Sequence, residues 1–227
     1  QDPHSHRLRA MSGFDQRYPS IEEVRNARRS YYAAVSYIDD HVGRIRAKLD
    51  ELNLLDNTVI VVTSDHGDML GEKGLWYKMS PYEESSRVPL IVYGPEHLVP
   101  QGRFSNPVSL IDLMPTLLEL SEAPQADVAG ISLLESARQE ASGKTGPQDR
   151  DVIIEYLAEG THAPQLTLIR GQYKYVVCPG DPDQLFDLTA DPYELQNVAA
   201  AEEYVSVAQQ MRKDVESRYN LEELEAE

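Results

Sequence analysis

The sequence has 227 residues, with 21 Lys and Arg against 38 Asp and Glu, and a formal net charge of −17 at pH 7. This negative charge argues against nucleic-acid binding through a basic surface. The longest apolar runs have about five to seven residues, far fewer than the ~20 needed to span a bilayer. The single cysteine, Cys178, excludes an intrachain disulfide and a multi-cysteine zinc site. We therefore expect no nucleic-acid or membrane partner and a cytoplasmic location, with a homo-oligomer left open.

The first part of the chain predicts an α/β fold. Ser20 and Glu23 form a capping-box pattern, and apolar residues then recur every three or four positions, which predicts one amphipathic helix over 21–52. We expect its apolar stripe to pack against a sheet: Tyr31, Val35, Ile38, Val42, Ile45, Leu49 and Leu52. Residues 58–63 and 88–93 are apolar on both faces, as is typical of strands buried between helical layers.

Residues 109–120 have helical spacing but contain Pro115, which predicts two short turns or a kinked helix. Residues 125–150 have few apolar anchors outside 131–134, so they are expected to form a linker or a surface excursion. These elements complete a predicted first unit over residues 1–150.

A second unit is predicted over residues 151–227. Three short strand-like runs, 152–157, 165–170 and 172–178, are expected to form a small antiparallel sheet with a tight hairpin at Gly171. The chain should close with an amphipathic helix over 201–225, its stripe formed by Val205, Ala208, Met211, Val215 and Tyr219.

The residues best suited to chemistry follow the strand at 58–63. Asp65 and His66 lie at its carboxyl end, where α/β sheets place ligands, and together they can ligate one cation. The dipeptide alone would equally suit a turn cap beside a surface histidine. Lys78, flanked by the single tryptophan, offers a point charge for a tetrahedral oxyanion, unless it points into solvent. Because three glycines allow a sharp return of the chain, we expect Asp65, His66 and Lys78 to share one pocket.

These residues belong to longer motifs. Thr63–Gly71, Lys78 and Arg87–Ile91 together resemble the second half of the signature of the sulfatases, a family of the alkaline-phosphatase superfamily. The resemblance continues through Ser109–Thr116, Ile169–Tyr175 and Leu185–Glu194. It implies part of an alkaline-phosphatase-like sheet sandwiched by helices, followed by a small antiparallel sheet and a carboxy-terminal helix. Within the family, four segments are most similar to bacterial choline sulfatases: Gln1–Ser5, Ser36–Asp40, Gly67–Ser80 and Asp214–Glu223.

The resemblance also implies roles for single residues. Asp65 and His66 match two ligands of one divalent metal ion, calcium first and manganese as the alternative. His66 and Lys78 match catalytic positions, with Lys78 holding the sulfate and steadying the leaving oxygen. The family's formylglycine nucleophile arises from a Cys/Ser-x-Pro-x-Arg pattern, which does not occur here. The chain is therefore expected to be the carboxy-terminal portion of a longer sulfatase, inactive alone, whose substrate is a small sulfate ester such as choline sulfate.

Two other functions stay open at this point. Asp, His and Lys at these spacings also suit a phosphonate monoester or phosphodiester hydrolase, and the acidic end of the chain would suit a non-catalytic interaction module. His4 and His6 are expected on a mobile surface segment, and Cys178 as a core thiol at a strand end. A group of polar residues could line a pocket for a cationic substrate or simply be solvated: Glu155, Glu159 and His162.

Overall fold

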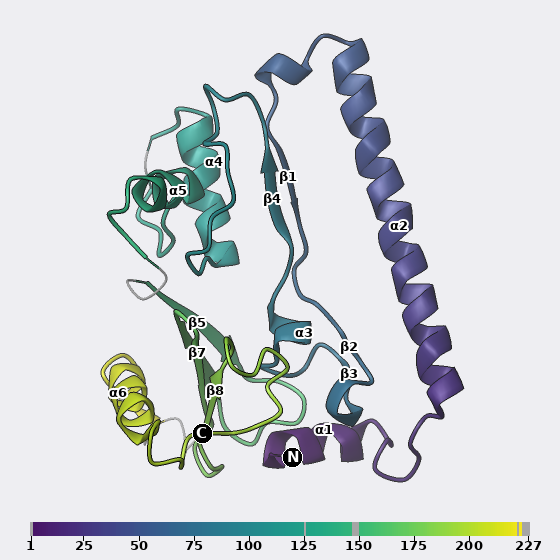
Figure 1. Ribbon diagram of the computed structural model, residues 1–227, viewed down its shortest axis with the longest axis vertical. Coiled ribbons are helices and arrows are strands. Elements are labelled where there is room, and N and C mark those ends of the chain that lie inside the picture. The colour runs from purple at the N-terminus through teal and green to yellow at the C-terminus, as the bar shows by residue number, and fades with distance from the viewer. Residues whose placement is uncertain (1, 125, 147–149, 222, 224–227) are drawn as a thin grey trace.

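The computed structural model describes residues 2–124, 126–146, 150–221 and 223. In chain order the elements are α1 (Pro3–Met11), α2 (Ile21–Glu51), η1 (Leu55–Asn57), β1 (Ile60–Thr63), β2 (Met69–Leu70), η2 (Glu72–Gly74), β3 (Trp76–Tyr77), α3 (Glu83–Ser86), β4 (Leu90–Tyr93), η3 (Leu110–Asp112), α4 (Leu113–Leu120), α5 (Leu133–Ala141), β5 (Asp151–Tyr156), β6 (Gln165–Arg170), β7 (Tyr173–Val177), β8 (Gln184–Asp187) and α6 (Val205–Glu216). Figure 1 shows the β1–β4 pair between α2 on one side and α4 and α5 on the other, with the four-stranded sheet below.

The long helix α2 begins where the sequence predicts. Ser20 Oγ accepts from the Glu23 amide at 3.3 Å, and the Glu23 carboxylate accepts from the Ser20 amide at 2.8 Å, so both halves of the capping box are present. The prediction that its apolar stripe packs against a sheet is wrong for this structure. No residue of α2 is buried, and Ile38 and Ile45 are each 57% exposed. A helical period shows which residues share a face, but how deeply that face is buried depends on the surface that packs against it.

The strand pair β1–β4 also differs from expectation. The strands pair antiparallel, with Ile60 opposite Tyr93 and Thr63 opposite Leu90. The expected burial on both faces is wrong, because β1 is half-buried and Ile91 in β4 is 57% exposed. Among the described residues each of these strands has one neighbour, so much of the pair remains open to solvent.

The next segment is more helical than the sequence indicates. The turn η3 and the helix α4 confirm the two elements expected around Pro115, which lies in the first turn of α4 where a missing amide costs little. Helix α5 corrects the expectation that residues 125–150 form a linker or a surface excursion. Ser132 caps it by accepting from the Leu134 amide at 3.2 Å, and Leu133 and Leu134 are buried. The helix is thus marked by a serine cap and by two adjacent leucines that pack into the fold.

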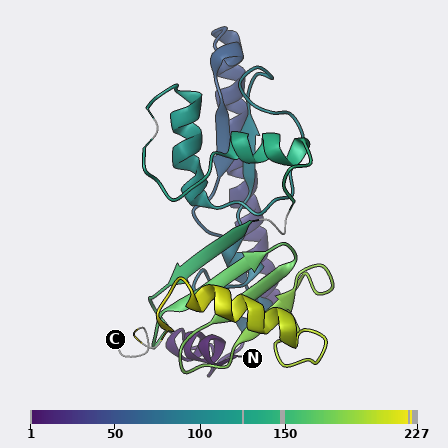
Figure 2. The ribbon, with the colours of Figure 1, turned by 90° about the vertical axis from the view of Figure 1, so that its left-hand side faces the viewer.

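The small sheet confirms its prediction. Strands β5, β6, β7 and β8 pair antiparallel in that order, and a two-residue loop with Gly171 at φ 56° joins β6 to β7. Figure 2 shows α6 lying across one face of this sheet. Their shared core includes Tyr175 and Leu185 from the strands and Met211 and Val215 from the helix. The helix α6 itself ends at Glu216, earlier than expected, and the predicted end at 225 lies outside the described residues.

The opposite face of the sheet packs on the loop that follows β1. Side chains alternate along a strand, so Lys174 and Val176 point away from α6. Val176 and Phe186 form a buried cluster with Met69, Leu75 and Tyr82, together with Leu8 of α1. The sheet thus supports the segment that carries the predicted site. No helix in the described ranges has the length and apolar character needed to cross a bilayer.

The amino-terminal segment corrects another expectation. His4 was predicted on a mobile surface, but residues 3–11 form the helix α1, capped by Asp2, which accepts from the Ser5 amide at 2.9 Å. The His4 side chain is 1% exposed, with its ring nitrogens 3.1 Å from the Gly160 carbonyl and 2.7 Å from the Met79 carbonyl. These acceptors lie far away in sequence, so no local pattern could indicate them. His6 is exposed, as predicted.

Candidate active site

Asp65 and His66 stand at the carboxyl end of β1 and face each other. The Asp65 carboxylate is 3.4 Å from His66 Nε2, and its side chain is 81% exposed. Desolvation by itself raises the pKa of Asp65, but the hydrogen bond from the His66 amide at 3.0 Å and the nearby imidazole lower it more. The carboxylate is therefore ionised near neutral pH and has room for a cation.

The tautomer of His66 follows from its contact with Gly67. His66 Nδ1 lies 2.8 Å from the Gly67 carbonyl oxygen. Because a carbonyl can only accept, Nδ1 carries a proton, so Nε2 is the ring nitrogen left to act as a metal ligand. Histidines that bind metals typically donate their other N–H to such a carbonyl. Nε2 and the Asp65 carboxylate thus lie close enough together to ligate one divalent ion, and that they do so stays a prediction.

A short hairpin returns the chain to this pair. Strands β2 and β3 pair antiparallel with Met69 opposite Tyr77, and Gly71 and Gly74 take φ values of 98° and 69° in the turn between them. Lys78 follows directly after β3 and is exposed. The Lys78 backbone is therefore close to β2, which begins three residues after His66. That the Lys78 ammonium comes within about 10 Å of the Asp65 carboxylate remains a prediction.

Ser85, which the sequence analysis missed, links the two segments of the site. Its carbonyl accepts from the Gly67 amide at 2.8 Å, and its hydroxyl donates to the Lys78 carbonyl. Ser85 is 2% exposed. The backbone packs so closely here that a Cβ atom on Gly67 would lie 2.1 Å from the Glu84 carbonyl oxygen. The glycine after His66 is therefore required by contact with the 84–85 backbone.

The acids considered for a cationic substrate group have partners within the chain. The Glu155 carboxylate accepts from the Tyr219 hydroxyl, and the Glu159 carboxylate lies 3.4 Å from the Tyr156 hydroxyl. Desolvation first, and then the nearby Glu159 carboxylate, raise the pKa of Tyr156 to about 12. Whether these acids line a substrate pocket stays a prediction.

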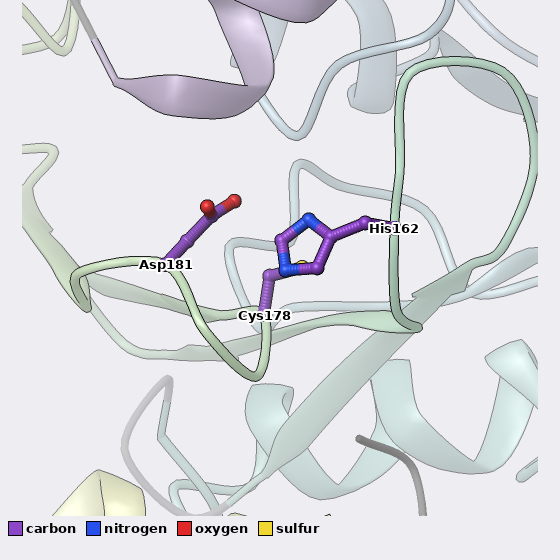
Figure 3. Close-up of side chains that lie close together, drawn as sticks. All are labelled: His162, Cys178 and Asp181. Carbon is purple, nitrogen blue, oxygen red and sulfur yellow. The ribbon is translucent and has the colours of Figure 1, made fainter. Parts of the chain in front are cut away.

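A second group of polar residues, His162, Cys178 and Asp181, lies at the end of β7 (Figure 3). Their ligand atoms are within 4.8 Å of one another, but each is already engaged. Asp181 accepts from Arg7 at 2.6 and 3.1 Å, His162 Nε2 lies 2.7 Å from the Pro179 carbonyl, and the Cys178 thiol donates to the Ala163 carbonyl at 3.4 Å. Burial raises the pKa of Cys178 to about 11, which disfavours the thiolate that metals bind. Cys178 is the core thiol predicted from the sequence.

Comparison with known proteins decides the family. Residues 3–123 match the sulfatase family, and residues 71–220 match the family described as N-sulphoglucosamine sulphohydrolase, C-terminal. The chain belongs to the sulfatase family. It is 43% identical over 206 residues to the choline-sulfatase of Rhizobium meliloti (strain 1021), covering 88% of this chain and 38% of that protein. It is 40% identical over 185 residues to arylsulfatase K of Gallus gallus, covering 78% of this chain and 34% of that protein.

Solved structures show the same fold. The structure of BT4656 in complex with D-glucosamine-2-N,6-O-disulfate matches with a TM-score of 0.74 at 27% identity, over 94% of this chain and 45% of that one. The phosphonate monoester hydrolase of Agrobacterium radiobacter matches with a TM-score of 0.72 at 27% identity, over 87% of this chain and 42% of that one. The mixed α/β architecture of the alkaline-phosphatase superfamily, with a small antiparallel sheet and a terminal helix, is thereby confirmed. The chain spans less than half the length of each of these relatives.

Proposed function

We propose that this chain forms the metal-binding and lysine-bearing part of a sulfuric ester hydrolase whose substrate is choline sulfate. The observation that carries the proposal is the Asp65–His66 pair, in which the exposed Asp65 carboxylate stands 3.4 Å from the imidazole nitrogen that does not contact the Gly67 carbonyl. Members of the sulfatase family generally use a metal ion and a formylglycine. The proposal assigns the formylglycine to residues outside this sequence, because the Cys/Ser-x-Pro-x-Arg pattern is absent from it.

In this proposal each residue acts on the negative charge of the sulfate group. Asp65 and His66 would hold a divalent ion, calcium or manganese, which when bound supplies positive charge for the sulfate oxygens. The ammonium of Lys78 would hold a nonbridging oxygen and stabilise the leaving alkoxide as the ester bond breaks. Such groups are effective because they are held in place before the reaction, so little reorganisation is needed in the transition state.

Two variants of the full-length protein test these roles. Asp65→Ala should lose both activity and bound metal, measured by elemental analysis of the dialysed protein. Lys78→Ala should keep the metal but lower kcat on choline sulfate by about 10²-fold or more, as expected when one charge-stabilising donor is removed. Near-normal turnover in both variants would refute the assignment, and so would a full metal content in Asp65→Ala.

Choline recognition rests on the similarity to the choline-sulfatase of Rhizobium meliloti and on aromatic groups beside the site. A hollow next to β3 is lined by Phe14, Trp76 and Tyr77, and aromatic faces are the usual binding surface for a quaternary ammonium. Arg17, paired with Glu23, also lines it, so the hollow offers no net negative charge. If the full-length enzyme cleaves a neutral aryl sulfate as efficiently as choline sulfate, the choline assignment fails while sulfate ester hydrolysis stands.

A phosphonate monoester hydrolase is the second candidate. It is favoured by the match to the enzyme of Agrobacterium radiobacter, at the same 27% identity as the match to the BT4656 complex. Phosphonate and sulfate esters both present tetrahedral anionic oxygens to a metal and a lysine, so the Asp65–His66 pair alone does not discriminate them. Side-by-side kcat/KM values of the full-length protein on choline sulfate and on an aryl phosphonate monoester decide between the two.

A further inference from the structure

A buried cation on the small sheet lies directly behind the loop that links the candidate site. Lys174, in the middle of β7, is 0% exposed. Its ammonium is 2.7 Å from a Glu83 carboxylate oxygen and 2.8 Å from a Glu194 carboxylate oxygen, and it donates to the Pro81 carbonyl at 2.9 Å. We call these three side chains the triad: Glu83, whose side chain is 18% exposed, and the fully buried Lys174 and Glu194.

The charges of the triad are costly to bury. Removing an ammonium and two carboxylates from water is expensive, and well-packed apolar residues of similar volume often stabilise a fold as well or better. Burial raises the pKa of Glu194, and the nearby Lys174 opposes that rise. The triad fixes the relative positions of the residues that carry its charges, because each charge must lie at hydrogen-bond distance from its partner.

That geometry is imposed on the loop over residues 81–86. Two of the groups bound by Lys174, the Pro81 carbonyl and the Glu83 carboxylate, belong to this loop. Glu194 binds the loop a second time, accepting from the Glu83 amide at 2.7 Å. Ser85 in the same loop bonds to both Gly67 and Lys78. An unbroken series of contacts therefore runs from the small sheet to the backbone on both sides of the candidate site.

We propose that Lys174 is a positioning residue, which acts through the 81–86 loop to hold Gly67, and with it Asp65 and His66, in register with Lys78. The kinetic part of this inference rests on the proposed function, whereas the conformational part does not. The small sheet is then more than a terminal appendage of the fold, because it sets the geometry of the site from behind.

The same sheet offers a matched control. Arg170 in β6 also bridges two carboxylates, with Asp151 at 2.6 Å and Asp214 at 2.7 Å. Its partners lie on β5 and α6, so none of them belongs to the 81–86 loop. Lys174→Met and Arg170→Met thus each remove one cation from between two acids, but only the first disconnects the loop. Glu83→Gln is a milder second variant in case Lys174→Met fails to fold.

Hydrogen exchange followed by mass spectrometry in the full-length protein tests the conformational part. Lys174→Met, or Glu83→Gln, should speed exchange at Gly67 and across residues 78–86 by about tenfold or more, since the opening of these segments becomes easier. Arg170→Met should leave both segments at the wild-type rate. Unchanged exchange in a folded triad variant overturns the inference, and so does an equal increase in Arg170→Met.

A double-mutant cycle tests the kinetic part. Lys174→Met should lower kcat by about tenfold or more with KM little changed, because a shift near 1 Å in a catalytic group can cost up to 10²-fold. Combined with Lys78→Ala it should cost less than the product of the two separate losses, since part of its effect passes through the position of Lys78. Additive losses overturn the positioning role. If wild-type protein hydrolyses no sulfate ester, the proposed function fails, and the exchange result still decides the inference.

Discussion

Replacing Gly67 by alanine probes the closest backbone contact behind the candidate site. A Cβ atom there would lie 2.1 Å from the Glu84 carbonyl oxygen and 3.1 Å from its carbon, whereas real Cβ atoms essentially never come within 3.0 Å of another heavy atom. The two segments must therefore separate by about 1 Å, a displacement that can lower turnover by up to 10²-fold when it reaches a catalytic group. It also stretches the hydrogen bond from the Gly67 amide to the Ser85 carbonyl, now 2.8 Å long.

We expect Gly67→Ala to reduce the free energy of unfolding by about 1–3 kcal/mol, the usual cost of overpacking. The assay is urea denaturation of the variant beside Gly43→Ala. Gly43 lies in α2, where a Cβ atom would meet nothing within 4 Å beyond the backbone of its own helix, so the same substitution there should stabilise the helix by about 0.5–1 kcal/mol. A Gly67→Ala variant that unfolds at the wild-type urea concentration and keeps wild-type kcat would refute the reasoning.

Three further predictions concern the rest of the chain. The Asp112 side chain is 0% exposed and lies 2.6 Å from the Arg150 guanidinium, so Asp112→Asn should lower the free energy of unfolding by about 3–5 kcal/mol. A decrease below about 1 kcal/mol in urea denaturation would contradict this. Cys178, whose pKa burial raises to about 11, should react with iodoacetamide at pH 8 at least ~100-fold more slowly when folded than in guanidinium, because its thiolate is scarce. Arg170, and then Arg218, hold the pKa of Asp151 below its usual value despite partial desolvation. The stabilisation from the ionised Asp151 is therefore present above about pH 4 and is lost as the pH falls below that value. Asp151→Asn should flatten that part of a plot of unfolding free energy against pH, and an unchanged plot would contradict the prediction.

The candidate site divides into a part that follows from the sequence and a part that does not. Asp65 and His66 are adjacent in the chain and follow a strand, so their proximity at a sheet edge could be predicted from local order alone. The glycines that turn the chain back toward Lys78 could also be read from the sequence, since Gly71 and Gly74 adopt positive φ angles that other residues avoid. The link through Ser85 could not be predicted, because serine in a polar loop has no pattern that distinguishes a buried bridge from a solvated side chain.

Elements defined by short-range interactions were determined by the sequence itself. The capping box of α2, the two-residue turn between β6 and β7 and the apolar stripe of α6 depend on residues within a few positions of one another. Their hydrogen bonds and side-chain periods form wherever the local chain allows them, so these predictions were confirmed.

Burial was decided only by the tertiary structure. No residue in the apolar stripe of α2 is fully buried, whereas two polar side chains, His4 and Lys174, are almost completely buried. His4 bonds to the Met79 carbonyl, 75 positions away, and Lys174 bonds to the Pro81 carbonyl, 93 positions away. A charged or polar group is stable in the interior only when a distant partner satisfies it, and an apolar face is buried only when a distant surface covers it. Neither condition is encoded in the local sequence, which is why the fold class was predictable and the connections behind the site were not.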